Sequence, residues 1–318
     1  MPGKPMSVGW PPVSTPRSID VPTGVRRFTL KTARGRFAAF EAMPATGVCE
    51  RRPALLVPGY TGSKEDFLPI LRQLAAAGRR VVAIDMRGQY QTPGTDDRAA
   101  YRLGELGADI GAIAAEMTGG PGQPPGPGEP AVHVLGHSFG GLVARETVLA
   151  KYATISSLTL MSSGPGPLTG PAAGELRAVL TPLRGLTGPQ LRTEVKRVWD
   201  LYLAPQVQAD GTPPHIIEFL RRRMLGNHPD GLTAMAEQLL DTPDRTAALA
   251  SSARAPILVL YGEYDDKWET PVQEEMAERL RAQRVCIPGA THSPAVEAPE
   301  TTASALNQFW NASENISR

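Results

Sequence analysis

The stretch Gly136-His137-Ser138-Phe139-Gly140-Gly141 joins two different patterns in a chain of 318 residues. Before it, residues 131–135 are mostly apolar, as expected for a strand that is buried on both faces. After it, residues 139–151 repeat apolar side chains at helical spacing. A Gly-x-Ser-x-Gly motif between a strand and a helix predicts a sharp turn that holds its serine in a strained backbone conformation, clear of the sheet. The outer glycines fit this turn, because side chains there would collide with neighbouring backbone.

Strands and helices alternate on both sides of this turn, which indicates the α/β fold class. The predicted strands are 25–31, 36–42, 54–57, 80–84, 131–135, 155–161, 256–261 and 284–287. The predicted helices are 66–77, 101–117, 139–151, 272–280 and 300–310. The first two strands meet at Gly35 and predict a hairpin. The rest of the order predicts a mostly parallel, doubly wound sheet with helices on both faces.

The alternation is interrupted once, by a long helical segment. Residues 165–250 contain no convincing strand pattern, and their apolar spacing predicts helices at 176–183, 190–203, 215–225 and 232–240. We therefore expect an inserted helical domain at 165–250, in a core formed by residues 25–164 and 251–318.

Two segments are rich in proline. Residues 1–24 contain six prolines, which predicts a loosely packed arm, and we expect the loss of residues 1–20 to change stability little. Residues 119–130 are ten glycines and prolines out of twelve, which predicts a surface loop, because the strand–helix alternation resumes directly after them.

The composition limits the classes of function. Lys and Arg total 33 against 32 for Asp and Glu, and a net charge of +1 argues against a nucleic-acid binder. Cys49 and Cys286 lack the number and spacing of a disulfide framework or a metal site, and no metal is expected. No apolar run approaches the length of a membrane-spanning helix, and the first 20 residues lack the apolar centre of a signal peptide. These features predict a cytoplasmic protein without membrane insertion; its oligomeric state is not determined by the sequence.

A serine hydroxyl is a weak nucleophile and needs a base to accept its proton. Of the five histidines, His292 follows the last predicted strand, at the carboxyl end where sites of open α/β sheets gather. His133 lies within a strand, and His215 and His228 lie in the helical insertion. His292 is therefore the expected base.

The base in turn needs a carboxylate that orients its ring and stabilises the imidazolium. Asp265 and Asp266 both follow the strand at 256–261, again at its carboxyl end. Successive loop side chains point in different directions, so only one is expected to face His292. The residues themselves leave this choice open.

Three segments together resemble those of the α/β-hydrolase fold superfamily, over about residues 25–312. GHSFGG (136–141), GEYDD (262–266) and GATHSPAVEAPE (289–300) look like its nucleophile, acid and histidine segments, in the family's order. Asp85-Met86-Arg87-Gly88 resembles the D-x-R-G turn of its esterase and peptidase-like members. The resemblance implies the α/β-hydrolase fold, with the helical insertion as its cap.

The resemblance also implies a role for each residue of the site. Ser138 is expected to be the nucleophile and His292 the base. Asp265 is expected to be the acid, because the family's acid sits three residues after the glycine that ends the strand. Two backbone N–H groups are expected to form the oxyanion hole: that of Phe139, directly after the nucleophile, and that of Tyr60 in the loop after the strand at 54–57.

The oxyanion loop departs from the family pattern, since it has Pro58-Gly59 where members often have His-Gly. The candidate substrate-binding residues are His137, Trp199, Tyr202 and Trp268. Other charged residues are interpreted as structural: Asp85 and Arg87 as an ion pair beneath the site, and Arg221-Arg222-Arg223 as a solvated helix face.

These expectations predict a serine hydrolase that cleaves a carboxylic ester or a related small acyl substrate through an acyl-enzyme. The chemistry needs no cofactor, and the chain has no nucleotide-binding or H-E-x-x-H motif. The same triad serves lactonases, thioesterases, amidases and iminopeptidases, which stay as alternatives. The alternatives from other classes are a lyase or cyclase without acyl transfer, and a ligand-binding module on the same fold.

Overall fold

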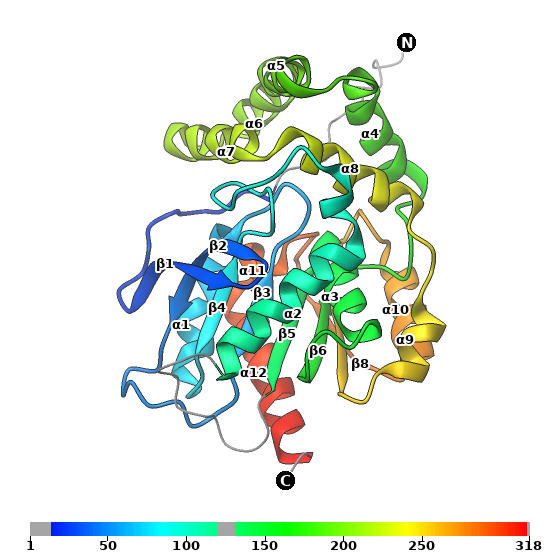
Figure 1. Cartoon of the computed structure of the whole chain (residues 1–318). Coiled ribbons are helices and arrows are strands. Elements are labelled where there is room, and N and C mark those ends of the chain that lie inside the picture. The colour runs from blue at the N-terminus through cyan, green and yellow to red at the C-terminus, as the bar shows by residue number, and fades with distance from the viewer. Residues whose placement is uncertain (1–13, 120–130, 317–318) are drawn as a thin grey trace.

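The computed structural model describes residues 14–119 and 131–316, and these form an eight-stranded sheet with helices on both faces (Figure 1). Most of the predicted arm (1–13) and of the predicted loop (120–130) lies outside the described residues. The strands are β1 Val25–Thr32, β2 Gly35–Ala42, β3 Ala54–Val57, β4 Val81–Ile84, β5 Val132–His137, β6 Ile155–Met161, β7 Ile257–Gly262 and β8 Gln283–Ile287.

The strand order across the sheet is β1-β2-β4-β3-β5-β6-β7-β8. Strand β2 pairs antiparallel with β1 and with β4, and every other neighbouring pair is parallel. The mostly parallel, doubly wound sheet predicted from the sequence is therefore confirmed. Because the parallel strands run in the same direction, the loops after β3, β5, β7 and β8 all emerge at one edge of the sheet.

Two apolar layers hold the helices of the core against the sheet. One face is covered by α2 Leu103–Gly119, α3 Phe139–Leu149 and α10 Thr270–Leu280. The other face is covered by α1 Leu68–Ala76 and α12 Pro299–Ile316, with the short α11 Pro294–Glu297 beside them. Strands β3, β4, β5 and β7 are buried along their whole length, which explains their continuous apolar runs.

The described residues between β6 and β7 contain helices and no strand. The helices are α4 Gly170–Leu180, α5 Gly188–Val198, α6 Ala204–Ala209, α7 Pro214–Gly226, α8 Pro229–Asp241 and α9 Thr246–Ser252, with a π turn at Trp199–Leu203. Helices α4 to α8 lie above the carboxyl ends of the strands (Figure 1). They enclose an apolar cluster of their own, which includes Leu191, Trp199, Phe219 and Leu220. The sequence missed α6 and α9.

Residues 14–24 contact both the helical insertion and the core. The Arg223 guanidinium on α7 donates to the Ser14 carbonyl oxygen over 2.6 Å. Ile19 packs against the apolar cluster of the insertion, and Val21 packs against the layer under α1 and α12. A few side chains thus attach residues 14–24 to both parts, and the small effect on stability expected for the loss of residues 1–20 stays a prediction.

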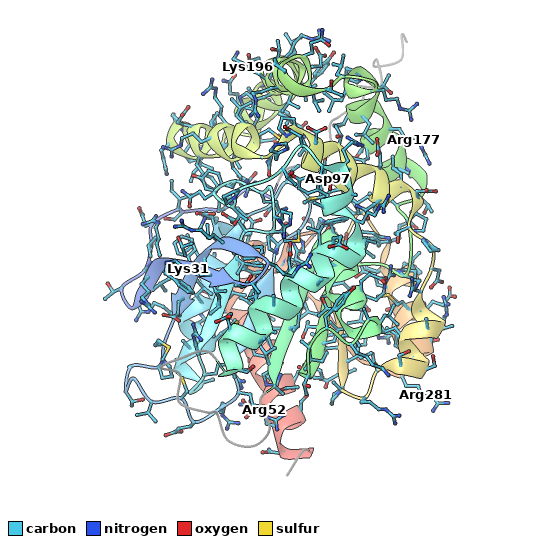
Figure 2. The ribbon with its side chains drawn as sticks, viewed as in Figure 1. Lys31, Arg52, Asp97, Arg177, Lys196 and Arg281 are labelled. Atoms are coloured by element: carbon cyan, nitrogen blue, oxygen red, sulfur yellow. The ribbon has the colours of Figure 1, made fainter. Side chains whose placement is uncertain are left out.

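The exposed charges are spread over separate elements. Figure 2 shows Lys31 on β1, Arg177 on α4, Lys196 on α5 and Arg281 after α10, all near the rim of the molecule. A search of the described helices finds none that combines the length and the hydropathy needed to cross a bilayer.

Candidate active site

The Gly-x-Ser-x-Gly turn has the predicted geometry, with β5 ending directly before Ser138 and α3 beginning directly after it. Ser138 has φ 52° and ψ −120°, a conformation that a residue with a Cβ adopts only under constraint. A Cβ on Gly136 would lie 2.2 Å from the Gly140 carbonyl oxygen, and a Cβ on Gly140 would lie 2.4 Å from the Pro58 carbonyl oxygen. Backbone contacts therefore require both glycines.

Ser138, His292 and Asp265 form a continuous chain of hydrogen bonds. Ser138 Oγ lies 3.0 Å from His292 Nε2, and His292 Nδ1 lies 2.8 Å from Asp265 Oδ1. Asp265 stands on the loop after β7 and His292 on the loop after β8, so three distant segments meet at the carboxyl end of the sheet. We refer to these three side chains as the carboxyl-end trio.

Asp265, and not Asp266, faces His292. The buried Asp265 also accepts hydrogen bonds from the Lys267 amide (3.1 Å) and from Gln273 Nε2 (2.9 Å). Burial acts to raise the pKa of Asp265, but the charge of His292 and these hydrogen bonds outweigh it and hold the pKa below its usual value. Asp266 is exposed and pairs with the Lys267 ammonium at 3.0 Å. The carboxylate at the site is therefore an ionised, fully hydrogen-bonded group.

His137 contacts the backbone of His292. Its Nε2 lies 2.7 Å from the His292 carbonyl oxygen, and because a carbonyl can only accept, Nε2 carries the proton. The ring is 4% exposed; burial, together with the nearby charge of His292, lowers the pKa of His137 to about 3. His137 is thus a neutral donor whose one N–H is directed at the loop that carries His292. Its predicted contact with substrate stays a prediction.

The loop after β3, residues 58–62, packs closely against the serine. A Cβ on Gly59 would lie only 3.0 Å from Ser138 Cβ. Within residues 14–119 and 131–316, the Tyr60 N–H has no hydrogen-bond acceptor. The Phe139 N–H opens α3 directly after the serine. Both amides predicted for the oxyanion hole therefore belong to segments that adjoin Ser138, and their role stays a prediction.

The three aromatic residues predicted to bind substrate lie in different surroundings. Trp268 is buried, and its ring centroid lies 6.4 Å from that of His292. Trp199 is buried in the apolar cluster of the insertion, against which Tyr60 also packs. Tyr202 is 43% exposed. The structure therefore brings Trp268 beside the carboxyl-end trio. It places Trp199 in the apolar cluster of the insertion and Tyr202 at the surface.

The predicted ion pair between Asp85 and Arg87 is wrong, because each has a different partner. Lys64 Nζ lies 2.8 Å from Asp85 Oδ2, and both side chains are almost completely buried. Arg87 instead makes a two-pronged contact with Asp109, at 2.6 and 2.8 Å. Burial raises the pKa of Asp85, and the Lys64 charge opposes this effect. No pattern around Lys64 predicts that its side chain lies in the interior.

The solvated helix face predicted for Arg221-Arg222-Arg223 is wrong for Arg223. Its side chain is 1% exposed, and its Nη1 donates to Asp66 Oδ1 in the core over 2.7 Å. One signal could have revealed this: Arg223 occupies the apolar stripe of α7, which consists of Ile216, Phe219, Leu220, Arg223 and Met224.

The described residues offer one group with a geometry that could hold a metal: ligand atoms of Asp96, His228 and Asp230 lie within 4.8 Å of one another. His228 Nε2 lies 3.3 Å from Asp96, and its Nδ1 lies 3.9 Å from Asp230. A metal ion binds one ring nitrogen, whereas here each carboxylate faces a different one. The two carboxylates therefore do not converge with a single ring nitrogen of His228, as the ligands of one metal ion would.

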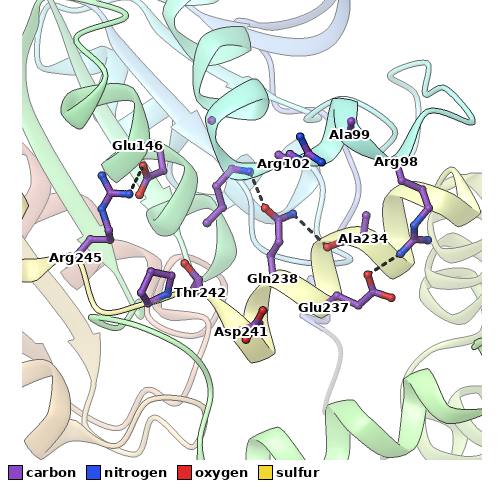
Figure 3. Close-up of a pocket in the computed structure, with 13 residues that line it drawn as sticks. Arg98, Ala99, Arg102, Glu146, Ala234, Glu237, Gln238, Asp241, Thr242 and Arg245 are labelled. Atoms are coloured by element: carbon purple, nitrogen blue, oxygen red, sulfur yellow. Dashed lines mark hydrogen bonds and ion pairs between the residues drawn. The ribbon is translucent and has the colours of Figure 1, made fainter.

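A cavity of about 590 Å³ lies where the start of α2 meets the end of α8 (Figure 3). Arg98 pairs with Glu237 at 2.6 Å on one side of it, and Arg245 pairs with Glu146 at 3.6 Å on the other. No member of the carboxyl-end trio lines this cavity. It is therefore separate from the candidate active site.

A serine on a strained strand–helix turn, hydrogen-bonded through histidine to aspartate at the carboxyl end of a doubly wound sheet, is typical of hydrolases on this fold. A sequence model described as the alpha/beta hydrolase family matches residues 54–305. The chain therefore belongs to the alpha/beta hydrolase family.

The similarity to individual proteins is lower or covers less of the chain than the match to the family model. Over 121 residues the chain is 31% identical to a Variovorax paradoxus protein named as a carbamate hydrolase, RutD; the alignment covers 38% of this chain and 41% of that protein. Over 181 residues it is 29% identical to a pimeloyl-(acyl-carrier protein) methyl ester esterase of Photobacterium profundum, covering 55% and 68%. A solved thermophilic esterase from Thermogutta terrifontis gives a TM-score of 0.67 at 21% identity, covering 91% of this chain and 99% of that one. This last likeness concerns the fold.

Proposed function

We propose that this protein is a serine hydrolase that cleaves a carboxylic ester or a related small acyl substrate. The observation that carries the proposal is a serine on a strained strand–helix turn that is joined, through the partly exposed His292, to Asp265 by hydrogen-bond distances of 3.0 and 2.8 Å. The similarity to a methyl ester esterase favours an ester as the substrate class.

In the acylation half-reaction, His292 Nε2 takes the proton from Ser138 Oγ as this oxygen attacks the substrate carbonyl carbon. Asp265 holds the ring of His292 and stabilises the imidazolium that forms. The carbonyl oxygen becomes an oxyanion, to which the N–H groups of Tyr60 and Phe139 donate. The alcohol then leaves with the proton from His292, and Ser138 keeps the acyl group.

In the deacylation half-reaction, water takes the place of the alcohol. His292 removes a proton from the water, whose oxygen attacks the acyl carbon through a second oxyanion. The carboxylic acid leaves, the proton returns to Ser138, and the enzyme is restored. Every proton transfer in this cycle uses side chains of the chain itself.

The insertion at 165–250 is proposed to act as a cap over the core formed by residues 25–164 and 251–318. One contact between the two parts supports this role: the apolar cluster around Trp199 packs against Tyr60 of the loop after β3. Trp268, Trp199, Tyr202 and His137 are the proposed contributors to the substrate pocket.

A carbamate or an amide is the second candidate substrate class. It is favoured by the partial match to a protein named as a carbamate hydrolase. The leaving group would then be an amine, protonated by His292 in the same step. Lactones and thioesters use the same sequence of bond changes and stay alternatives.

The test is the intact-protein mass after treatment with a fluorophosphonate, for wild type and Ser138→Ala. We expect one adduct on wild type and none on the variant, followed by turnover in a panel of esters, lactones, thioesters and carbamates. A folded wild type that takes no adduct would refute an activated Ser138. Ligand binding without turnover would favour a binding module, and activity retained in Ser138→Ala but lost in His292→Ala would favour a lyase or cyclase.

A further inference from the structure

Gln89 links the turn after β4 to the oxyanion loop. The side chain is 1% exposed, and both ends of its amide are used. Its Oε1 accepts the Met86 N–H over 3.0 Å, and its Nε2 donates to the Gly59 carbonyl oxygen over 2.9 Å. A buried glutamine with both ends satisfied holds its partners in fixed positions.

The carbonyl group that Gln89 holds belongs to the same peptide unit as the Tyr60 N–H. This peptide bond is trans, so the Gly59 C=O and the Tyr60 N–H point in opposite directions. The Gly59 oxygen also accepts the Gly62 N–H over 3.1 Å, on the inner side of the loop. The Tyr60 N–H is therefore directed away from the interior of the loop, and no described residue accepts it.

This peptide unit benefits from an external hold because residue 59 is glycine. A Cβ there would lie 3.0 Å from Ser138 Cβ and 3.2 Å from His137 Nδ1, closer than ordinary Cβ contacts, so the missing side chain favours the close approach of the loop. Glycine, however, has the widest backbone freedom, and a peptide beside it rotates at low cost. The close approach to Ser138 and the rotational freedom of the Gly59–Tyr60 peptide therefore arise from the same missing side chain.

We propose that Gln89 is a positioning residue of the oxyanion hole. Its amide fixes the Gly59–Tyr60 peptide in the orientation that directs the Tyr60 N–H at the oxyanion formed on Ser138. The inference rests on the proposed function, because an oxyanion forms only if Ser138 attacks a carbonyl group. Gln89 itself does not touch the substrate.

Three variants test the proposal. Gln89→Leu removes both hydrogen bonds, whereas Gln89→Glu keeps an acceptor for the Met86 N–H and removes only the donor to Gly59. Gln91→Leu is the matched control, because this glutamine lies two residues further on and contacts the Lys64 ammonium instead of the oxyanion loop. Circular dichroism and thermal unfolding identify which variants fold; if Gln89→Leu does not, Gln89→Glu carries the test.

The readouts are kcat and KM for the best ester of the panel, and the Ki of a trifluoromethyl ketone with the same acyl chain. Ser138 Oγ adds to this ketone, its proton passes to His292, and the ketone oxygen becomes an oxyanion. We expect both Gln89 variants to lose kcat about 10–100-fold, as for weakening one oxyanion donor. We expect an unchanged KM and a Ki that rises in proportion to the loss of kcat/KM. Gln91→Leu should match wild type.

Two results would overturn the proposal: unchanged kcat in a folded Gln89→Glu variant, or a loss of kcat without a rise in Ki. Failure of the proposed function looks different. In that case wild type itself takes no fluorophosphonate adduct and hydrolyses no member of the panel, and both proposals fall together. If Ser138 is labelled and wild type turns over substrate, a negative result concerns Gln89 alone.

Discussion

Two serine–histidine–carboxylate chains lie at opposite ends of the same sheet. One is the carboxyl-end trio. The other, which we call the amino-end trio, consists of Ser157, His133 and Glu314. In it, Ser157 Oγ lies 2.7 Å from His133 Nδ1, and His133 Nε2 lies 3.0 Å from Glu314 Oε1. By distances alone the two trios are almost equivalent.

Their surroundings are different. Ser157 and His133 are both 0% exposed, and Glu314 is also held by the buried Arg79 guanidinium at 2.8 Å. The His133 ring stacks on Trp310. The side chain of His292 in the carboxyl-end trio is 18% exposed. The comparison teaches that access, a strained serine and adjoining backbone donors define a candidate hydrolase site, whereas hydrogen bonds among three side chains do not.

The largest expected effect separates the two serines. Ser138→Ala should lower kcat/KM about 10⁴-fold or more, because it removes the nucleophile. Ser157→Ala should leave kcat/KM within about twofold, since only one buried hydrogen bond is lost. Steady-state kinetics on the preferred ester make the measurement. Equal losses in the two variants would mean that the amino-end trio takes part in the reaction.

The next effect separates stability from activity. Glu314→Gln should lower the free energy of unfolding by about 3 kcal/mol, because it removes one partner of a buried ion pair. The folded fraction should keep its kcat. Urea unfolding followed by tryptophan fluorescence gives the free energy, with Glu194→Gln in the exposed pair with Arg197 as the control that changes little. Stability equal to wild type would show that Arg79 and His133 do not depend on Glu314.

The amino-end trio should also give the protein an acid-sensitive stability. Burial lowers the pKa of His133 to about 4, although the hydrogen bond to Glu314 acts against it. An unfolded histidine titrates near 6.5, so between about pH 6.5 and 4 the unfolded chain binds a proton that the folded chain does not. Stability is therefore full above this window and falls as the pH decreases through it.

The matching measurement is the unfolding free energy as a function of pH, in wild type and in His133→Asn. Between pH 4.5 and 6, the unfolding free energy should change less steeply with pH in the variant. The difference in slope should be roughly 1.4 kcal/mol per pH unit, which corresponds to about one proton taken up on unfolding. His137, with a pKa lowered to about 3, gives wild type a further slope of the same sign that both proteins share. Identical slopes would show that His133 is not the titrating group.

The smallest effect concerns a hydrogen bond that the amino-end trio lacks. His137→Phe removes the donor to the His292 carbonyl, and we expect kcat to fall about tenfold as the loop of the base loses its exact position. His137→Gln can reach the same carbonyl and should recover part of this loss. If Gln and Phe give equal kcat at equal thermal stability, the hydrogen bond does not position His292.

The sheet and the carboxyl-end trio could be predicted because their signals are local. Ser138 stands between two glycines in one short motif: backbone of the same turn requires Gly136, and backbone of β3 and the loop after it requires Gly140. β3 is a short continuous apolar run because both of its faces are covered. Asp265 follows another such run, β7, and His292 follows the more polar edge strand β8; parallel strands bring their carboxyl ends together. The choice of Asp265 over Asp266 came from the family resemblance.

The buried charged contacts could not be predicted, because each depends on a partner that is far away in the sequence. Arg223 meets Asp66 across 157 positions, and His133 meets Glu314 across 181. The identity of a charged residue is the same whether its side chain faces water or a buried partner, so composition and periodicity do not separate the two cases. The missed helices α6 and α9 have six and seven residues, which is too short for apolar periodicity to be informative.

The buried pair between Arg223 and Asp66 gives the helical insertion a third attachment to the core, in addition to its two chain connections. Any movement of α7 away from the core has to separate these two charges, and a buried charge that loses its partner is strongly unfavourable. The pair therefore acts as a latch, which restrains the hinge motion that an insertion held by its two connections alone would allow.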